Sequence, residues 1–159
     1  MNRDPYVGWP CGRECAVCKW KPRENVKENC NLQNLVYKGI CKLCEEEEKL
    51  RMEREEEESG EVHESQRTES SEIITEYIGE TCKSLYIRSS KHMEDYRLLK
   101  KESFILKHHI KAHPKTNLGE VQVRFVTHIK HQTCFRRQIS EAVAIKLSRN
   151  DPKKRNINN

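Results

Sequence analysis

Apolar residues gather in short runs in the first half of the chain. Residues 1–33 hold Gly, Pro, Asn and four cysteines with almost no apolar periodicity, so we expect a loop-rich module organised by metal. Residues 34–41 (NLVYKGIC) are apolar and β-prone, which predicts a strand. A second strand is expected where apolar residues return, at Ile73, Ile74, Tyr77 and Ile78.

The second half alternates between helical and extended patterns. Helical spacing over residues 84–101 predicts a helix with Ser84 as its N-cap, and a shorter helix is expected at about 102–112. Alternation of polar and apolar residues predicts a third strand over 120–127, and residues 134–148 form the last expected helix. The apolar residues that share one face of that last helix are Ile139, Ala142, Val143 and Leu147.

This order of elements predicts an α+β fold, with a small three-stranded, mainly antiparallel sheet flanked by helices. We expect a cysteine-rich zinc module at 1–33, a main domain at 34–150 and a basic, mobile tail at 151–159. A Glu-rich stretch at 45–72 interrupts the main domain. Its charge density predicts a solvated or disordered insert that is helical only in part.

The composition gives little material for a core, because hydrophobic and charged residues each make up 35% of the chain. The first ten residues hold charges and two prolines instead of an apolar run, and no stretch approaches the roughly 20 apolar residues of a membrane span. We therefore expect no membrane partner and an intracellular, nuclear location. In a reducing compartment, eight cysteines that include groups at short spacing favour metal over disulfides.

The charge is divided unevenly along the chain. Residues 45–76 contain fourteen Glu against four Lys or Arg, whereas the remainder contains twenty-six basic against eleven acidic residues. A strongly basic domain suits a polyanion such as nucleic acid. The basic residues expected to line a surface for the DNA backbone are Lys83, Lys91, Arg97, Lys100, Lys101, Lys107, Lys111, Arg136 and Arg137.

The first cysteine cluster consists of Cys11, Cys15, Cys18 and Cys30. Four thiolates complete a tetrahedral zinc shell, and the Cys15-x-x-Cys18 pair is the usual chelating step. The alternative is a set of unligated cysteines on a flexible arm. Neither a core nor an oxidising compartment is available to explain the clustering, so zinc is the favoured interpretation.

A second cluster begins with Cys41-x-x-Cys44 and needs two further ligands. His108 and His113 lie five positions apart at a predicted helix end, which suits the second half of a Cys2His2 zinc site, with His109 as the substitute for His108. The alternative is a surface histidine run on a basic helix. The remaining two cysteines are expected to be ordinary semi-buried thiols: Cys82 and Cys134.

Several motifs resemble the GIY-YIG endonucleases. The run from Leu35 to Ile40 resembles the first strand of that family, and residues 77–81 (YIGET) match the second half of its name. Arg88 and His92 follow at the family's helix spacing, and Glu141 resembles its late metal-binding acid. The position of the second cluster, between and after the tyrosine motifs, is similar to the zinc-containing enzymes of Penelope-like retroelement polyproteins.

The resemblance implies a metal-dependent DNA endonuclease with catalytic Mg²⁺ or Mn²⁺ and two structural zinc ions. It implies that Glu141 binds the divalent metal and Arg88 the phosphate. Tyr37 would activate water, with its pKa lowered by nearby cations, while Tyr77 and His92 position the phosphate and Tyr37 or relay a proton. Each residue also has an ordinary alternative, as a sheet aromatic or a surface charge.

The chain departs from the family pattern in several places, one of which is Cys82, where close relatives often have Gly. The first motif reads Leu-Val-Tyr, the Glu-rich stretch lengthens the connection between Tyr37 and Tyr77, and a late Asn could be either Asn156 or Asn158. Two other functions therefore remain open: a decayed endonuclease that binds nucleic acid through zinc, and an interaction protein that acts through its acidic stretch. A retroelement origin would make a reverse transcriptase segment of the parent polyprotein a partner.

Overall fold

The computed structural model describes residues 15–20, 30–59 and 74–158. The elements within them are, in order, a 3₁₀ helix η1 (Cys18–Trp20), β1 (Leu35–Cys41), α1 (Lys42–Ser59), β2 (Ile74–Thr81), α2 (Leu85–Arg97), α3 (Phe104–Ala112), β3 (Val123–Lys130), α4 (Cys134–Asn150) and β4 (Lys154–Asn156). The predicted α+β class is confirmed. Cys11, Ile73 and part of the Glu-rich stretch lie outside the described residues.

The sheet is mixed and has four strands in the order β3-β1-β2-β4, so the expectation of three strands was wrong. β1 pairs antiparallel with β2 and β3, while β4 runs parallel to β2. The extra strand comes from the basic tail that was expected to be mobile. The sequence of this tail is polar, so no apolar pattern predicts a strand there. Backbone pairing with β2 holds the tail in place, including a hydrogen bond from Ile157 N to Glu76 O (3.0 Å).

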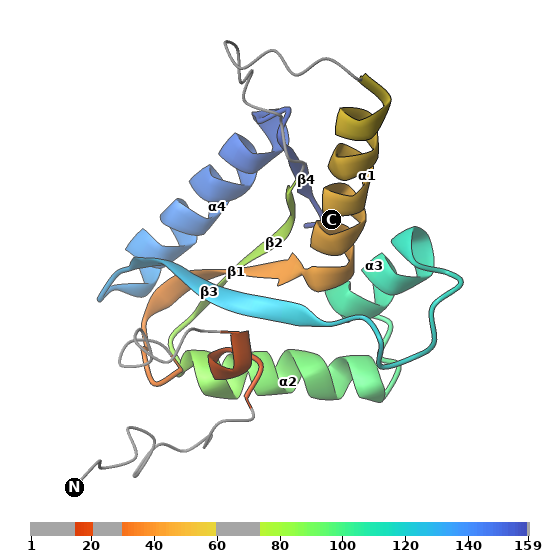
Figure 1. The fold of residues 1–159 in the computed structure, drawn as a ribbon. Helices are drawn as coiled ribbons and strands as arrows, with labels where there is room; N and C mark the ends of the chain where they lie inside the picture. Colours follow the sequence, from red (N-terminus) through yellow and green to blue (C-terminus); the bar gives the residue numbers. More distant parts are fainter. Residues whose placement is uncertain (1–14, 21–29, 60–73, 159) are drawn as a thin grey trace, which may run out of the picture.

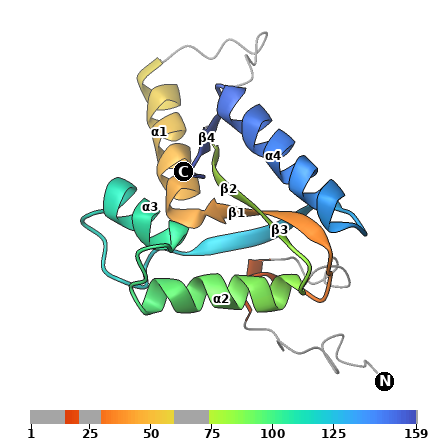
Figure 2. The same ribbon diagram turned by 180° about the vertical axis from the view of Figure 1, so that it is seen from behind.

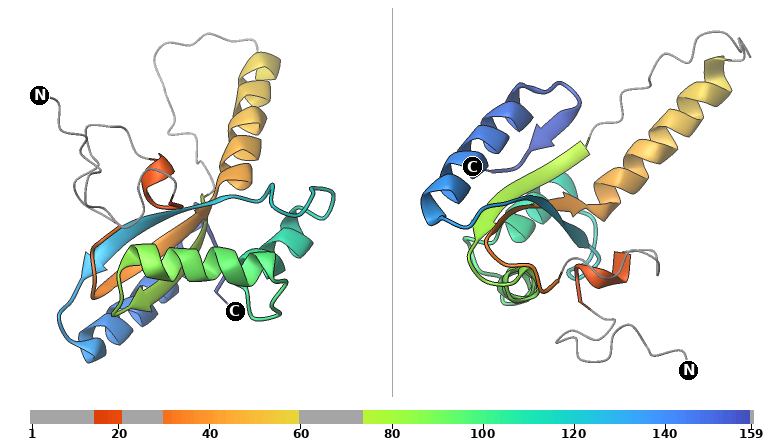
Figure 3. Two further views of the ribbon diagram at one scale, coloured as in Figure 1. Left: turned by 90° about the horizontal axis from the view of Figure 1, so that it is seen from below. Right: turned by 90° about the vertical axis from the view of Figure 1, so that its left-hand side faces the viewer.

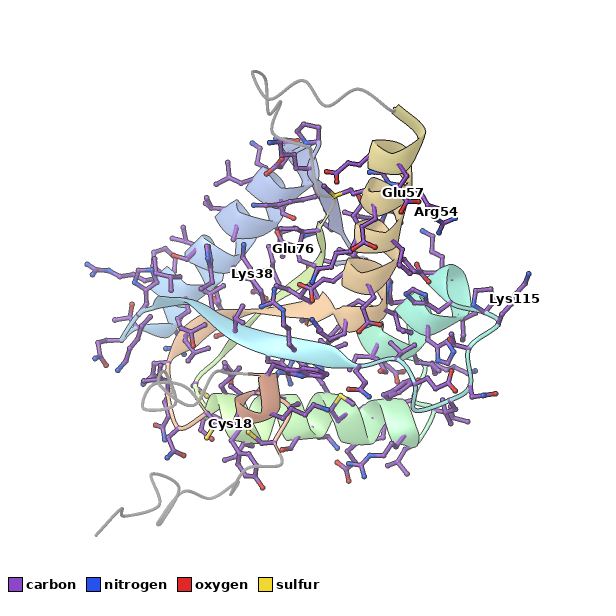
Figure 4. The ribbon with its side chains drawn as sticks, in the orientation of Figure 1. Cys18, Lys38, Arg54, Glu57, Glu76 and Lys115 are labelled. Atoms are coloured by element: carbon purple, nitrogen blue, oxygen red, sulfur yellow. The ribbon has the colours of Figure 1, made fainter. Side chains whose placement is uncertain are left out.

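Helices cover the two faces of the sheet unequally (Figures 1 and 2). α2 and α3 cover one face, where the larger core contains Tyr37, Leu85, Tyr96, Ile105 and Phe125. α4 covers part of the other face over a small core of three buried residues. Lys38 and Glu76 lie on the α4 side of the sheet and Cys18 lies beside α2 (Figure 4), and the Lys38 ammonium is 3.2 Å from the buried Glu76 carboxylate.

The Glu-rich stretch, expected to be solvated or disordered and helical only in part, is helical throughout its described part. Glu, Lys and Arg are good helix formers, and ion pairs at i, i+3 and i, i+4 spacing support the exposed turns. Arg51 contacts both Glu48 and Glu55 in this way. The helix projects away from the sheet (Figure 3), so its high charge stays in solvent.

The face of α4 turned to the sheet is not the apolar one. The three buried residues of this helix are Arg137, Ala144 and Ser148, while Val143 and Leu147 are exposed. Helical periodicity predicted the helix but the wrong buried face, because small residues permit close approach and Arg137 has specific partners. Cys82 and Cys134 are exposed rather than semi-buried.

The expected helices at 84–101 and 102–112 and the third strand are present with shifted bounds. Ser84 is the N-cap of α2, and its side chain accepts a hydrogen bond from Ile87 N. β3 begins three residues later than the predicted third strand. Among the described helices, none has the length and apolar character needed to cross a membrane. The three-part division of the chain stays a prediction.

Candidate functional site

The second cluster brings together the four residues expected from its spacing. Cys41 ends β1, Cys44 lies in the first turn of α1, and His108 and His113 lie in and just after α3. Their ligand atoms all fall within 4.8 Å of one another. The Cys44 sulfur is 3.3 Å from His108 Nε2 and 3.2 Å from His113 Nε2. Tetrahedral zinc with Zn–S and Zn–N bonds of about 2.3 and 2.0 Å requires S···N distances of roughly 3.5 Å, so this arrangement can hold the ion.

The surroundings of this cluster also suit a metal. His113 turns its other ring nitrogen toward the Glu47 carboxylate, 3.2 Å away, as metal-bound imidazoles commonly do. The hydrogen bond with Cys41 lowers the pKa of the Cys44 thiol, while the same interaction and burial raise the pKa of Cys41. His109 is not a ligand, since its nitrogens bond to Tyr96 Oη (2.8 Å) and Thr116 O (2.9 Å).

Three residues of the first cluster also come together. Cys15, Cys18 and Cys30 are buried, and their sulfurs lie within 4.8 Å of one another. The backbone N–H of Cys18 donates to the Cys15 sulfur (3.2 Å), which fixes the turn that aims both thiols inward. These three sulfurs can supply most of a tetrahedral shell. The fourth predicted ligand, Cys11, lies outside the described residues.

A different group of side chains surrounds the middle of β1. The Tyr37 hydroxyl lies 2.6 Å from His92 Nε2 and accepts a hydrogen bond from Arg88 Nε (3.0 Å). Burial, together with the charge of Arg88, lowers the pKa of His92 from 6.5 to about 3, so the ring is neutral near pH 7. In the tautomer with its proton on Nδ1, the neutral imidazole accepts at Nε2 and the Tyr37 hydroxyl donates to His92.

Tyr77 completes this cluster on the neighbouring strand. Its ring stacks on Phe104 with centroids 3.8 Å apart and meets Tyr37 at 6.2 Å. The Tyr37 and Tyr77 phenols both interact with the guanidinium of Arg88 and raise its pKa, although burial opposes them. One fixed cation thus lies beside two phenol oxygens.

Gly79 is required for the two tyrosines to meet. A Cβ atom at this position would lie 2.6 Å from Tyr37 Oη and 2.9 Å from Tyr77 Cε1, closer than van der Waals contact permits. Tyr37 and Gly79 are direct partners in the β1–β2 register. The phenol of Tyr37 therefore crosses the space that any other residue at position 79 would fill.

Glu141 reaches this group from α4, past the end of β4. Lys153 O and Ile157 N bond to the outer edge of β2 at Ile74 and Glu76. Farther along that edge, the backbone N–H of Glu80 donates to the Glu141 carboxylate. Glu141 also interacts electrostatically with Arg88 and Tyr77. The open edge of β2 is thus where groups from both faces of the sheet meet.

Asn158 bonds to the outer edge of β2 between Glu76 and Glu80. Its side-chain oxygen accepts from Ile78 N (2.7 Å), and its side-chain nitrogen donates to Ile78 O. The sequence left Asn156 and Asn158 as equal candidates for a late Asn. Both lie beside β2 in the structure, and it is the Asn158 side chain that bonds to the backbone next to Tyr77. Strand spacing alone could not identify it, because the tail had no predicted structure.

The electrostatics of Tyr37 differ from the expectation. Burial raises the pKa of its phenol and outweighs the opposing charge of Arg88, so nearby cations do not lower it overall. Burial and the Glu80 carboxylate also raise the pKa of Glu141, despite its backbone hydrogen bond and Arg88. The positive charge of Arg88 does not offset burial at either group, and a bound divalent cation would add positive charge at this point.

A cleft of about 920 Å³ opens beside Arg88 and Glu80 along the outer side of α2. Lys83, Lys91 and Arg97 from the predicted basic surface line it. Arg137, in contrast, is only 3% exposed, which excludes it from that surface. Sequence reasoning missed the contributions of Phe104 and Glu80, since nothing in their spacing indicates contact with this site.

The five predicted residues therefore lie in one group. Its charged members are Arg88 and Glu141, and its other members, Tyr37, Tyr77 and His92, lie between the sheet and α2. Such a group can bind a phosphate, hold a hard cation and move a proton. Comparison with known proteins adds no assignment, because no protein-family model, curated protein or solved structure matches the chain.

Proposed function

We propose that the chain is a metal-dependent DNA endonuclease of the GIY-YIG type, derived from a retroelement polyprotein, that hydrolyses phosphodiester bonds. The observation that carries this proposal is the meeting of Tyr37, Arg88 and His92 with Glu141 at the open edge of β2. Aromatic packing alone would explain the tyrosines. It would not explain a half-buried Arg88 beside a half-buried carboxylate next to an open cleft.

The proton path follows from the hydrogen bonds. Arg88 binds a non-bridging oxygen of the scissile phosphate and stabilises the charge that develops on it. Tyr37 removes a proton from the attacking water as His92 takes the proton of the Tyr37 hydroxyl, 2.6 Å away. The water oxygen bonds to phosphorus, the bond to the leaving oxygen breaks, and that oxygen takes a proton from solvent. His92 returns the proton it accepted to solvent, because its lowered pKa of about 3 does not let the buried ring keep a charge near pH 7. Tyr77 orients the phosphate beside Arg88.

Glu141 is the residue that would hold the Mg²⁺ or Mn²⁺ of this reaction. A single carboxylate suits Mg²⁺, which keeps most of its waters. The bound cation would neutralise the phosphate and favour ionisation of a buried oxygen nearby. The two Cys/His clusters contribute zinc-dependent stability and not chemistry, since thiolate and imidazole shells favour zinc over hard cations.

DNA is the proposed substrate, bound mainly through its phosphates by the basic residues around α2 and α3. Such contacts predict weak sequence preference and strong salt dependence. A nuclear location and a reverse transcriptase segment as partner belong to the same proposal. The second candidate is a decayed endonuclease that binds nucleic acid, which is favoured by the raised pKa of Tyr37.

Nicking of supercoiled plasmid by the full chain in Mg²⁺ tests the proposal. The wild type should nick, and Glu141→Gln should reduce the rate at least about 100-fold. Glu102→Gln, an exposed acid away from the site, is the matched control and should match the wild type. Equal rates in all three would overturn the assignment of Glu141. No nicking by the wild type, with retained DNA binding, would favour the decayed enzyme.

A further inference from the structure

Arg137 is a charged residue buried at the start of α4. It is 3% exposed, although arginine rarely loses its solvent contact without compensation. A buried guanidinium is tolerated only where its donors find acceptors and its charge finds a partner. The contacts of Arg137 therefore show what the fold requires at this point.

Its partners come from three separate segments. The Arg137 Nε atom donates to the Glu80 carboxylate (3.1 Å) at the end of β2. Its Nη1 atom donates to the Asn34 side chain (3.1 Å) and to the carbonyls of His131 (3.3 Å) and Gln132 (3.4 Å). Asn34 precedes β1, and the two carbonyls precede α4. One planar group thus joins the segment before β1, the end of β2 and the segment before α4.

Glu80 carries this connection to the proposed active site. Its side chain bonds to Arg137, while its backbone N–H donates to the Glu141 carboxylate. Arg137 and Glu141 are four residues apart and share one side of α4. Glu80 is therefore held by two successive turns of the helix, and this contact sets where Glu141 lies along the edge of β2.

We propose that Arg137 is a positioning residue that, through Glu80, holds the Glu141 carboxylate where it can bind the catalytic divalent metal. This inference rests on the proposed function. It also excludes Arg137 from direct DNA contact, because its guanidinium is consumed by protein acceptors. The fork of the guanidinium is essential, since a lysine ammonium cannot reach acceptors on three segments at once.

Arg137→Lys tests the proposal, and Arg136→Lys is its matched control, because Arg136 is the exposed neighbour on the same helix. Loss of a residue that orients a metal ligand commonly weakens metal affinity by about 10- to 100-fold. We expect Mn²⁺ affinity, measured by calorimetry on the full chain, to fall by that factor in Arg137→Lys and to stay unchanged in Arg136→Lys. The nicking rate at saturating DNA should fall in parallel, with DNA affinity and zinc content unchanged.

Glu80→Gln keeps a hydrogen-bond acceptor for Arg137 but removes the negative charge of the Glu80 side chain. This variant replaces Arg137→Lys in the test if Arg137→Lys does not fold. It should weaken Mn²⁺ affinity in the same direction. Hydrogen exchange of the Glu80 amide gives a readout without metal or DNA: it should accelerate in Arg137→Lys and in Glu141→Ala, but not in Arg136→Lys.

Unchanged Mn²⁺ affinity and Glu80 exchange in Arg137→Lys would overturn the positioning role. A parallel loss of zinc, DNA binding and activity would also overturn it, in favour of a general structural role. If the wild type binds Mn²⁺ through Glu141 but never nicks DNA, the proposed function fails while the affinities still decide the role of Arg137.

Discussion

β1 carries two different kinds of site at two points along its length. At its end, Cys41 joins three further soft ligands in a closed and largely buried cluster. Near its middle, Tyr37 is buried among groups that include one carboxylate and one guanidinium, and the guanidinium, that of Arg88, lines an open cleft. A closed shell of sulfur and nitrogen leaves no position for substrate, whereas a single carboxylate leaves most of a hard cation's shell open. The comparison separates residues that stabilise from residues that can react.

The largest expected effect comes from removing a ligand of the closed cluster. Cys44→Ala should lower the free energy of unfolding by at least about 4 kcal/mol, because the loss of a structural metal is among the most destabilising changes. Zinc content, measured by mass spectrometry, should fall from two ions per chain to one. Cys82→Ala removes an exposed thiol and should change neither quantity. Equal zinc content in both variants would contradict the cluster.

A substitution in the open site around Tyr37 and Arg88 should instead lower activity and leave stability unchanged. Arg88→Lys keeps a charge but loses the planar fork, so we expect the nicking rate to fall about 100-fold, equivalent to about 3 kcal/mol in the transition state. Melting temperature and zinc content should stay close to the wild type. Arg54→Lys, at an exposed position of α1 outside the predicted DNA-binding surface, is the control. A wild-type rate in Arg88→Lys would remove this residue from the reaction.

Gly79→Ala should lower both the stability of the fold and the nicking activity. The added methyl would lie within 3 Å of both tyrosine rings, so one of them must move. We expect a loss of about 1–3 kcal/mol in unfolding free energy, typical of overpacking, and a loss of nicking. Urea denaturation with parallel zinc analysis checks this. A variant with wild-type stability would mean that Tyr37 does not cross this space.

The smallest effect concerns His92 and pH. Since burial lowers its pKa from 6.5 to about 3, the unfolded chain takes up a proton below pH 6.5 that the folded chain refuses. Stability from this group is complete above pH 6.5 and is lost as the pH falls toward 3. At pH 5 the loss should be about 1–2 kcal/mol. His92→Gln should show a correspondingly flatter pH dependence, and an equal slope in both proteins would contradict a neutral, buried ring.

The sequence was most informative where one residue type has few uses. The pair Cys41-x-x-Cys44 called for two ligands, and His108 and His113 lie beside it in the structure. Periodicity predicted the helices, and Ser84 predicted a cap. Apolar pattern failed on α4, where small and charged residues contact the sheet while Val143 and Leu147 face solvent. In α1, the helix propensity of Glu, Lys and Arg outweighed the repulsion between the Glu side chains. Composition alone does not show which of these two effects is larger.

Contacts that depend on tertiary approach could not be predicted. β4 has no apolar alternation, and its order depends on the free edge of β2. The raised pKa of Tyr37 depends on burial, which sequence spacing does not reveal. The bonds of Arg137 join segments more than a hundred residues apart in sequence, and the guanidinium was expected at the surface.

Anomalous X-ray scattering from crystals of the full chain soaked with Mn²⁺ tests the difference between the two sites most directly. The account predicts zinc signal at the sulfur clusters and a manganese signal beside the Glu141 carboxylate, on the side that faces Arg88. Manganese at the sulfur clusters, or its absence at Glu141 at saturating concentration, would contradict the division between a closed stabilising site and an open reactive one.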